Sequence, residues 1–415
     1  MGVASKRPTT LVLLTRNFPS PEGDYAFLRN EICYLAKSYD RVLVFPYIMD
    51  GGPPVDLPAN VEYHGRLWEA TSAEGWRQIL RPTGAWRALR ALATEWHSGR
   101  LAMVGSRLTV EAVAHGTKFA ARILGALGSD RGEITVYSFW GTGGALALPF
   151  LPKRFRKIVR VHGHDLYEDP DHPLRLRAAI HSSVDLIATI SEHGKTHLER
   201  EFPDLSAQRK IVTSRLGSPD GGRGPAPTPG EPWTIVSCAY ARDIKRLDLV
   251  LATVAEVSKA HPTRWVHFGG GAGEEKLKEL AAAAEAGAPR LSVELRGDTP
   301  NQAIHEFYRE HAVNAFVSLS STEGLPVSIM EALSYGIPVV ATDVGGTAEL
   351  VGETLGSGIL LPPDPTVNEA ARAIVRACEG RSEFDPRRVW KERTDAERAA
   401  KRIVSILRGV RSPLE

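Results

Sequence analysis

Two glutamates, Glu323 and Glu331, stand eight positions apart in the stretch SSTEGLPVSIMEALSYGIPVVATDVGG, residues 320–346. The first lies before a Gly-Leu-Pro turn, and the second lies in a segment whose apolar residues predict a buried helix. A carboxylate on a buried helix is costly unless hydrogen-bond donors satisfy it. Glu331 is therefore a candidate for accepting hydrogen bonds from a ligand, such as the two vicinal hydroxyls of a ribose.

The start of the same helix predicts an anion site. Pro326 suits the first helical turn, where its missing N–H costs nothing. The N–H groups of Val327, Ser328 and Ile329 then lack partners within the helix and lie at the positive end of its dipole. We expect a phosphate group to bind there. Glu323 would stand just outside this helix start, and Glu331 about one and a half turns inside it.

Other residues that could do chemistry lie further along the chain. His162, His164 and Asp165 are close enough in sequence to ligate zinc, but no distant ligand pair matches them, so we expect no metal. A buried core histidine is the alternative for His162. Lys245 could hold a phosphate or be an ordinary solvated lysine. The glycine run at 269–273 lacks the full Gly-x-Gly-x-x-Gly spacing, which favours a tight turn over a dinucleotide loop.

The elements that must position these residues alternate between strand and helix patterns. In the first half, strands are predicted at 10–15, 41–47, 133–139 and 184–191, with helical stretches between them. A Gly- and Pro-rich segment without periodicity, GSPDGGRGPAPTPGEPW, then indicates a linker, and the alternation restarts at Trp233. Strands that alternate with helices predict parallel βαβ units, and ligands bind such sheets at the carboxyl ends of the strands.

We therefore predict two α/β domains. The expected limits are 1–218 for an acceptor-binding domain, 219–232 for a hinge linker, 233–395 for a donor-binding domain, and 396–415 for a C-terminal helix that packs back on the first domain. A chain of 415 residues suits two domains of this size.

Composition narrows the class of protein. The chain is 43% hydrophobic and 24% charged, and its three cysteines are widely spaced, which favours a globular protein of a reducing compartment. Its apolar runs are too short to span a bilayer, and no signal-peptide pattern opens the sequence. We expect a cytoplasmic protein. Residues 1–218 carry 28 Lys and Arg against 22 Asp and Glu, an excess too small and scattered to predict nucleic-acid binding.

One basic segment leaves two interpretations open. Residues 74–105 interleave Trp76, Trp86 and Trp96 with arginines. Such a segment can lie on a membrane surface, which would give weak peripheral contact at the inner face of the membrane and a lipid-linked acceptor. The preferred interpretation is a helical pair that covers the core of the first domain, with its arginines extending outward.

The stretch EGLPVSIMEALSYGIPVVATDVGGTAELV resembles the donor-site signature of the retaining glycosyltransferases of family 4, which have the GT-B architecture of two Rossmann-like domains that face each other across a cleft. The signature is a glutamate, seven residues, a second glutamate, a small-residue turn, a PVVA strand and a Gly-Gly loop. VRVHGHDLYED, IVSCAYARDIKRLDLVLATV, VHFGGGAGEEKLKEL and NFPSPEGDYAFLRNEI resemble further family segments, so the resemblance covers nearly the whole chain.

The resemblance implies roles for individual residues. Glu323 would bind donor-sugar hydroxyls, Glu331 the ribose, Lys245 the diphosphate, and His162 a sugar hydroxyl or the reacting centre. The catalytic candidates are His162, Glu323 and Lys245; the donor-binding candidates are Gly23, Asp165, Arg242, Lys245, Gly270, Glu323, Gly324, Leu325, Pro326, Val327 and Glu331. The family arginine five positions before the lysine is Tyr240 here. Either Arg242 reaches the diphosphate from a shifted loop, or Lys245 acts with Arg246 or with donors from elsewhere.

The implied function is retaining transfer of a sugar from a nucleoside-diphosphate sugar, with UDP favoured and GDP next, and with no metal or other cofactor. The acceptor hydroxyl could belong to a saccharide, a lipid-linked intermediate or a small natural product. Two alternatives remain: a nucleotide-sugar epimerase on the same fold, and a non-catalytic homologue that binds nucleotide sugars. A dehydrogenase is disfavoured because the glycine run lacks an acidic ribose partner at the expected distance.

Overall fold

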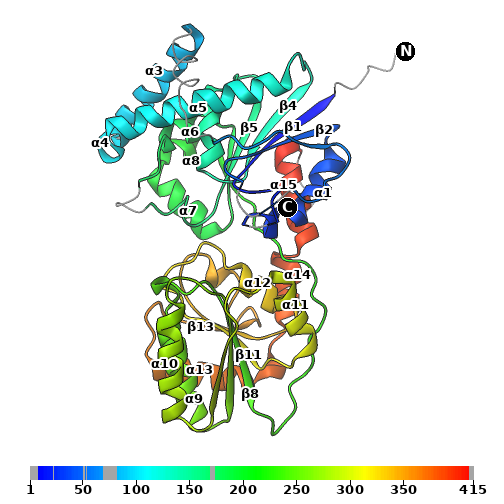
Figure 1. Cartoon of the computed structure of the whole chain (residues 1–415), viewed down its shortest axis with the longest axis vertical. Coiled ribbons are helices and arrows are strands. Elements are labelled where there is room, and N and C mark those ends of the chain that lie inside the picture. The colour runs from blue at the N-terminus through cyan, green and yellow to red at the C-terminus, as the bar shows by residue number, and fades with distance from the viewer. Residues whose placement is uncertain are drawn as a thin grey trace. The chain divides into compact units, whose positions relative to one another are not determined.

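The computed structural model of the chain describes residues 8–21, 23–49, 52, 54–68, 82–168 and 173–410. It contains two compact units. Unit 1 comprises residues up to Ser214 together with those from Ala400 onward, and unit 2 comprises Arg215–Ala399. Each unit has its own hydrophobic core. In Figure 1 each unit is a sheet with helices packed on its faces.

Unit 1 is built on a seven-stranded parallel sheet with the order β3-β2-β1-β4-β5-β6-β7. Its strands are β1 Thr9–Thr15, β2 Arg41–Pro46, β3 Val61–Tyr63, β4 Glu133–Ser138, β5 Arg156–Val161, β6 Leu186–Thr189 and β7 Ile211–Thr213. Its helices are α1 Tyr25–Ser38, α3 Pro82–His97, α4 Arg100–Val104, α5 Ser106–Leu127, η1 Gly143–Phe150, α6 Arg177–Ser183, α7 Glu192–Glu201 and α8 Pro203–Ala207. The short apolar runs of the sequence are the central strands, which are buried along nearly their whole length.

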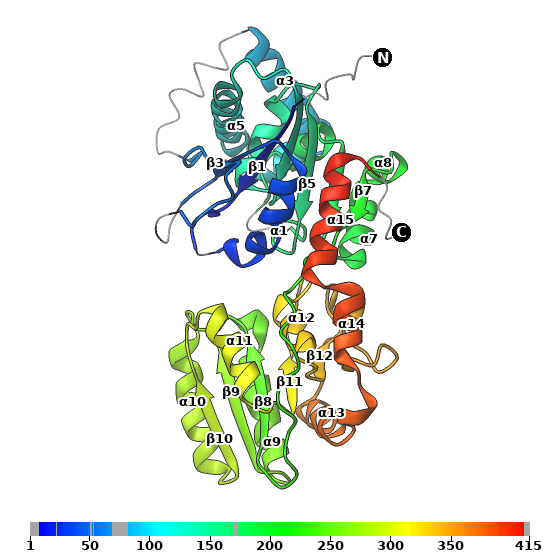
Figure 2. The ribbon, with the colours of Figure 1, turned by 90° about the vertical axis from the view of Figure 1, so that its right-hand side faces the viewer.

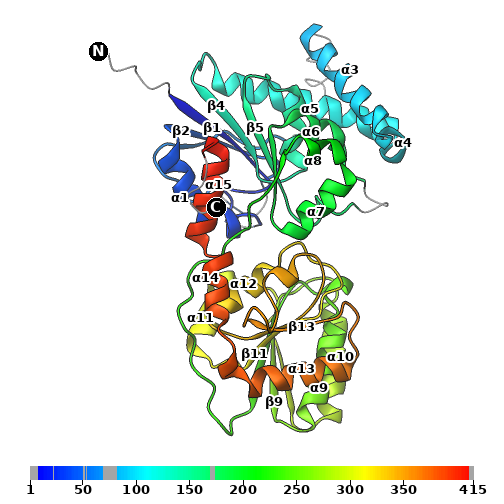
Figure 3. The same cartoon turned by 180° about the vertical axis from the view of Figure 1, so that it is seen from behind.

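Unit 2 has a six-stranded parallel sheet with the order β10-β9-β8-β11-β12-β13. Its strands are β8 Trp233–Cys238, β9 Thr263–Phe268, β10 Leu291–Leu295, β11 Ala315–Ser318, β12 Val339–Thr342 and β13 Gly358–Leu361. Its helices are η2 Asp243–Lys245, α9 Leu247–Ser258, α10 Glu274–Gly287, α11 Asn301–Glu310, α12 Val327–Ser334, η3 Thr347–Glu349, α13 Val367–Glu379, η4 Arg381–Glu383 and α14 Pro386–Arg393. Helices α9 and α13 pack side by side (Figure 3).

Both sheets have the strand order of the Rossmann fold, 3-2-1-4-5-6, with one strand added in unit 1. The fold is thus two Rossmann-like α/β domains, as the alternation of strand and helix patterns predicted. The order reverses between β1 and β4 in unit 1, and between β8 and β11 in unit 2. These reversal points are where open α/β sheets bind ligands.

Two segments connect the units along the chain. The Gly- and Pro-rich segment predicted as a linker lies against unit 2, where Gly224 N–H donates to the Tyr335 carbonyl and Arg387 pairs with Asp220 at 2.9 Å. Helix α15, Ala396–Arg408, returns to unit 1 (Figure 2). There the Arg156 guanidinium donates to the carbonyl oxygens of Ile406 and Leu407. The domain limits inferred from the sequence stay predictions.

None of the helices within the described residues is long and apolar enough to cross a membrane.

Candidate active site

An ion pair connects the two loops at the reversal point of unit 2. Lys245 ends η2 after β8, and Glu323 lies in the loop after β11. The Lys245 ammonium donates to Glu323 Oε1 at 2.6 Å, and the two side chains are 20% and 13% exposed. Two residues that lie 78 positions apart therefore meet where a ligand of this sheet would bind.

Backbone and side-chain hydrogen bonds fix this pair in place. Ser321 N–H donates to the Ile244 carbonyl at 2.8 Å, which joins the loop after β11 to η2. Arg246 has a left-handed backbone, with φ at 46°, and its guanidinium donates to the carbonyl oxygens of Leu319 at 2.5 Å and Ser320 at 2.9 Å. It also pairs with Asp364. Arg246 is thus engaged by the protein itself and braces the loop that carries Glu323.

Arg242, the other candidate for the missing family arginine, is exposed at the start of η2. Its side chain makes no hydrogen bond or ion pair with any of the described residues, although its backbone N–H donates to the Tyr240 carbonyl. Tyr240, at the position of the family arginine, is 61% exposed. Arg242 is therefore the arginine of this loop that an anionic ligand can reach without breaking a protein contact.

Glu331 lies inside α12 and is only 7% exposed. Asn301, at the start of α11, donates its side-chain N–H to Glu331 Oε1 at 2.8 Å, and His305 Nε2 lies 3.6 Å from the same oxygen. Tyr335 holds His305 through a 3.0 Å contact between its hydroxyl and Nδ1. Burial raises the pKa of the Cys238 thiol, at the end of β8, to about 12, and the charge of Glu331 adds to the effect. The carboxylate is fixed beside the carboxyl end of β8.

The turn between Glu323 and α12 requires glycine at a distant position. Gly345 has a φ of +55°, and a Cβ there would lie 1.7 Å from the Glu323 carbonyl oxygen. Gly346 N–H donates to the Gly324 carbonyl at 2.9 Å. The Gly-Gly loop after β12 thus packs directly on the Glu323–Gly324 turn. Leu325 is buried, and α12 begins at Val327 with Pro326 as its N-cap residue, one position later than the sequence predicted.

The glycine run after β9 packs on the loop that follows β8. Gly269 has a φ of +127°, and a Cβ there would lie 2.0 Å from the Ala239 carbonyl oxygen. Ala241 N–H donates to the Gly270 carbonyl at 2.8 Å, and Gly273 N–H donates to the Ala241 carbonyl at 3.0 Å. The run forms a close backbone contact that shapes the loop leading to Lys245.

In unit 1, His162 and Asp165 form a buried pair after β5. Asp165 accepts the N–H groups of His162 at 2.6 Å and Gly141 at 2.7 Å. Burial alone would raise the pKa of Asp165, but its contacts with His162 and with the Gly141 N–H hold that pKa below its usual value. Burial lowers the pKa of His162, whose ring packs against Phe139 and Trp140 and makes no hydrogen bond to the described residues.

Sequence reasoning missed Asp24, which organises the loop after β1. Its carboxylate accepts the N–H groups of Arg16 at 2.6 Å, Asn17 at 2.9 Å and Phe18 at 2.7 Å, and the indole N–H of Trp140 at 3.2 Å. The predicted site residue Gly23 precedes it with a φ of +64°. The signal in the sequence that could have identified Asp24 is an acidic residue next to a glycine at the start of a predicted helix.

Unit 1 contains a cavity of about 390 Å³ at the carboxyl ends of its strands. Its lining includes aromatic and cationic side chains from the segments after β1, β2, β3, β4 and β5, among them Arg16, Tyr47, Trp68, Trp140, His164 and Arg175. Aromatic faces suit the apolar faces of sugar rings, and the guanidinium groups suit an anionic or hydroxyl-rich ligand.

The structure thus brings Lys245, Glu323 and Glu331 together with Gly270, Gly324, Leu325, Pro326 and Val327 around the reversal point of unit 2, and it places Gly23, His162 and Asp165 in unit 1. Asn301, His305 and Gly345 join the unit 2 set. The sequence analysis named the Gly-Gly loop that contains Gly345, but it named none of the three as a site residue. Across the residues that the structure describes, no three His, Cys, Asp or Glu side chains are grouped to hold a metal ion.

Part of the chain is similar in sequence to known glycosyltransferases. The GtfA subunit of a UDP-N-acetylglucosamine–peptide N-acetylglucosaminyltransferase from Streptococcus gordonii is 28% identical over 181 residues, which are 43% of this chain and 34% of that protein. The chain spans less than half the length of the curated relatives it matches first.

Solved structures match nearly the whole chain. The apo lipopolysaccharide outer core galactosyltransferase WaaB covers 96% of this chain and 99% of its own, with 14% identity and a TM-score of 0.67. HepE from Anabaena, solved in complex with UDP, covers 97% and 100%, with 15% identity and a TM-score of 0.64. At these identities the likeness shows the fold, which is the GT-B fold.

The family model described as glycosyl transferases group 1 matches residues 223–402, the segment that contains Lys245, Glu323 and Glu331. The part of the chain that contains these donor-site candidates is thus similar to the glycosyl transferases of group 1.

Proposed function

We propose that this protein transfers a sugar from a nucleoside-diphosphate sugar to a hydroxyl group of an acceptor, with retention of the anomeric configuration. The Lys245–Glu323 pair at the reversal point of unit 2 is the observation that carries this proposal. A lysine suits the diphosphate, and a carboxylate beside it suits the sugar hydroxyls. UDP is the favoured nucleotide, because it is named in the S. gordonii relative and bound in the Anabaena structure.

Departure of the nucleoside diphosphate develops negative charge, which a fixed electrostatic environment can stabilise. Lys245 supplies one positive charge, and the first N–H groups of α12 supply the positive end of a helix dipole. Arg242 adds a second cation that no described residue neutralises. These groups support a mechanism that needs no metal, in which the diphosphate leaves and the acceptor attacks from the same face of the sugar.

Glu331 would accept hydrogen bonds from the ribose hydroxyls. Asn301 donates to Oε1, so Oε2 is the oxygen better placed for a ligand hydroxyl. His162 and Asp165 in unit 1 would contact the donor sugar or the reacting centre. The aromatic and cationic cavity of unit 1 favours a transferase over an epimerase, because an epimerase has no acceptor to bind.

Calorimetric titration with UDP, GDP, ADP and their sugar conjugates tests the proposal. We expect one nucleotide to bind, and Glu331→Ala to weaken it at least tenfold, since the enzyme loses hydrogen bonds to the ribose. The control is Glu310→Ala, which removes an exposed carboxylate at the end of α11. Absence of nucleotide binding, or equal affinity of the two variants, would contradict the assignment. Binding without release of sugar to any acceptor would favour the non-catalytic homologue.

A further inference from the structure

Helix α3 turns three of its large apolar side chains toward solvent, while Leu92 packs against the core of unit 1. Trp86 is 72% exposed, Leu89 60% and Trp96 73%. At 3.6 residues per turn these positions lie on one side of the helix. The opposite side, with Ala88, Ala91 and Glu95, is the buried one. Met103 on α4, 55% exposed, adds a fourth apolar side chain, and we call these four residues the apolar stripe.

This orientation is set by the packing of the buried side. Glu95 is 1% exposed and accepts the N–H of Ala179 at 2.8 Å, while Ala88 and Ala91 belong to the core of unit 1. The small alanines therefore face the core, and the tryptophans cannot turn inward without breaking this contact. Two exposed tryptophans on one helix side are costly in water, which marks an interaction surface.

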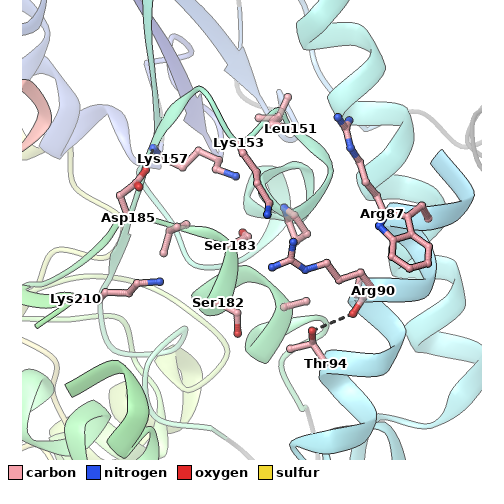
Figure 4. A pocket seen from close by; sticks show the side chains of 15 residues that line it. Arg87, Arg90, Thr94, Leu151, Lys153, Lys157, Ser182, Ser183, Asp185 and Lys210 are labelled. Carbon is pink, nitrogen blue, oxygen red and sulfur yellow. Dashed lines mark hydrogen bonds between the residues drawn. The ribbon is translucent and has the colours of Figure 1, made fainter. Parts of the chain in front are cut away.

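A cavity of about 500 Å³ lies beside the same helix. Arg87 and Arg90 of α3 line it together with Lys153, Lys157 and Lys210, and Asp185 is the one carboxylate among its lining residues. Figure 4 shows Arg90, Lys153 and Lys157 extending into the same space. We call these five cationic residues the basic pocket. Its charge excess suits an anion.

Lys157 makes the pocket more than a solvated basic surface. It is 5% exposed, and no described residue accepts a hydrogen bond from its ammonium group. Burial lowers the pKa of Lys157, Asp185 opposes that change, and Arg87 and Arg90 add to it. Asp185 already accepts the Lys157 backbone N–H at 2.7 Å. The ammonium nitrogen itself is not fully enclosed, so a bound anion can reach it and pair with it.

The basic pocket lies at the opposite edge of the sheet from the substrate cavity. Lys157 is the second residue of β5, Asp185 precedes β6, and Lys210 precedes β7, so the pocket is at the amino ends of these strands. The cavity lined by Tyr47, Trp140 and His164 is at the carboxyl ends. The basic pocket is therefore separate from the place where the sheet of unit 1 binds substrates.

We propose that the apolar stripe and the basic pocket form a docking surface for an anionic lipid membrane. Tryptophan and leucine side chains on one side of a helix insert at the level of the headgroups, and adjacent basic residues bind anionic lipids. Arg90 belongs to the flank of α3 next to Trp86, so one helix presents both features. The pocket would receive the phosphate of a lipid headgroup. This proposal does not depend on the proposed sugar transfer.

Co-sedimentation with lipid vesicles tests it. We expect the protein to bind vesicles of an equimolar mixture of phosphatidylcholine and phosphatidylglycerol, and to bind pure phosphatidylcholine at least tenfold more weakly. Arg90→Glu/Lys153→Glu should weaken binding to the mixed vesicles at least tenfold, because two favourable charges become unfavourable. Trp86→Ala/Trp96→Ala should weaken it comparably and leave the salt dependence unchanged.

Matched variants separate this surface from general charge and hydrophobicity. Lys37→Glu/Lys195→Glu makes the same charge change on α1 and α7, and Tyr63→Ala removes another exposed aromatic side chain of unit 1. Both should bind the mixed vesicles like the unchanged protein. Nucleotide affinity, measured on every variant, reports folding and the donor site independently.

Three results would overturn the proposal. The first is equal loss of binding in the test and control variants. The second is absence of vesicle binding combined with concentration-dependent self-association that Trp86→Ala/Trp96→Ala abolishes, since the apolar stripe would then join two copies of the chain. The third is binding of inorganic phosphate to the pocket without any vesicle binding, since the pocket would then be a site for a soluble anion.

Discussion

The two sheets have the same strand order, yet their reversal points are held together by different chemistry. In unit 1, Asp24 joins the loops after β1 and β4 by accepting three backbone N–H groups and the Trp140 indole. In unit 2, Lys245 and Glu323 join the loops after β8 and β11 through one ion pair. Asp24 is 1% exposed, whereas the ion pair keeps contact with solvent.

The difference indicates that Asp24 has a structural role, whereas the Lys245–Glu323 pair is suited to binding a ligand. Every hydrogen bond of Asp24 goes to the protein, and a ligand that competed for it would disorder the loop. In the proposed function, the diphosphate of the donor would bind Lys245 and its sugar hydroxyls would bind Glu323, so that the ligand replaces the contact between the two side chains. We infer that unit 1 presents a preformed surface and that unit 2 exchanges an internal ion pair for ligand contacts.

The largest expected effect is on the stability of unit 1. Asp24→Ala leaves three backbone N–H groups and an indole N–H without their acceptor, which should lower the free energy of unfolding by about 4 kcal/mol. Asp24→Asn keeps one acceptor oxygen and should lose about half as much. Urea unfolding would measure the free energy of unfolding, and hydrogen exchange would show which of the two units has lost stability. The exposed Asp56→Ala should change little, and equal stability of the Asp24 and Asp56 variants would contradict the structural role.

The alternation of strands and helices, and the position of Glu331 on a buried helix, could be predicted because both are local patterns. The role of Asp24 could not. A carboxylate before a helix usually caps that helix, but Asp24 makes no side-chain capping bond to α1 and accepts N–H groups from the preceding loop instead. The hydrogen bonds of Asp24 depend on how the preceding loop folds back over it, which the spacing of residues does not specify.

The orientation of α3 is a second feature that the sequence did not predict. The sequence indicated an amphipathic segment with tryptophans, and the preferred interpretation had it covering the core with its arginines outward. Residues 74–81, with Trp76, lie outside the described residues. The described part, α3, does cover the core, but it does so with Ala88, Ala91 and Leu92, and Trp86 and Trp96 face solvent. Hydrophobicity alone would turn the larger side chains inward. The contact of Glu95 with Ala179, 84 positions away, decides the orientation, and no local pattern contains it.

The next effect concerns catalysis in unit 2. Lys245→Met should lower the rate of sugar transfer, or of donor hydrolysis where no acceptor is known, by about 10²–10³-fold, because one fixed positive charge at the leaving diphosphate is lost. The free energy of unfolding of this variant should change by less than about 1 kcal/mol, since a partly exposed ion pair contributes little to stability. Rate assays and urea unfolding on the same sample would separate the two. A loss of stability that matches that of Asp24→Ala would remove the contrast between the units.

A smaller effect should follow from disturbing the turn that carries Glu323. In Gly345→Ala the new Cβ would collide with the Glu323 carbonyl oxygen, so the turn must shift. We expect nucleotide-sugar affinity to fall about tenfold to thirtyfold, equivalent to about 2 kcal/mol. The control is Gly230→Ala, which has a similar positive φ of +87° but no atom within 4 Å of the new Cβ. Calorimetry on both variants isolates the collision from backbone strain, and equal affinities would show that the turn does not position the donor.

The smallest expected effect distinguishes two arginines of one loop. Arg242 is exposed without a partner among the described residues, whereas Arg246 donates to Leu319 and Ser320. Arg242→Ala should therefore lower the transfer rate about fivefold to tenfold, about 1 kcal/mol, with stability unchanged, because a flexible cation contributes less than the fixed Lys245. Arg246→Ala should lower the urea midpoint, since the carbonyl oxygens of Leu319, Ser320 and Pro363 lose their donor. If Arg242→Ala left the rate unchanged, this loop would supply a single cation to the diphosphate, and unit 2 would depend on Lys245 and the start of α12 alone.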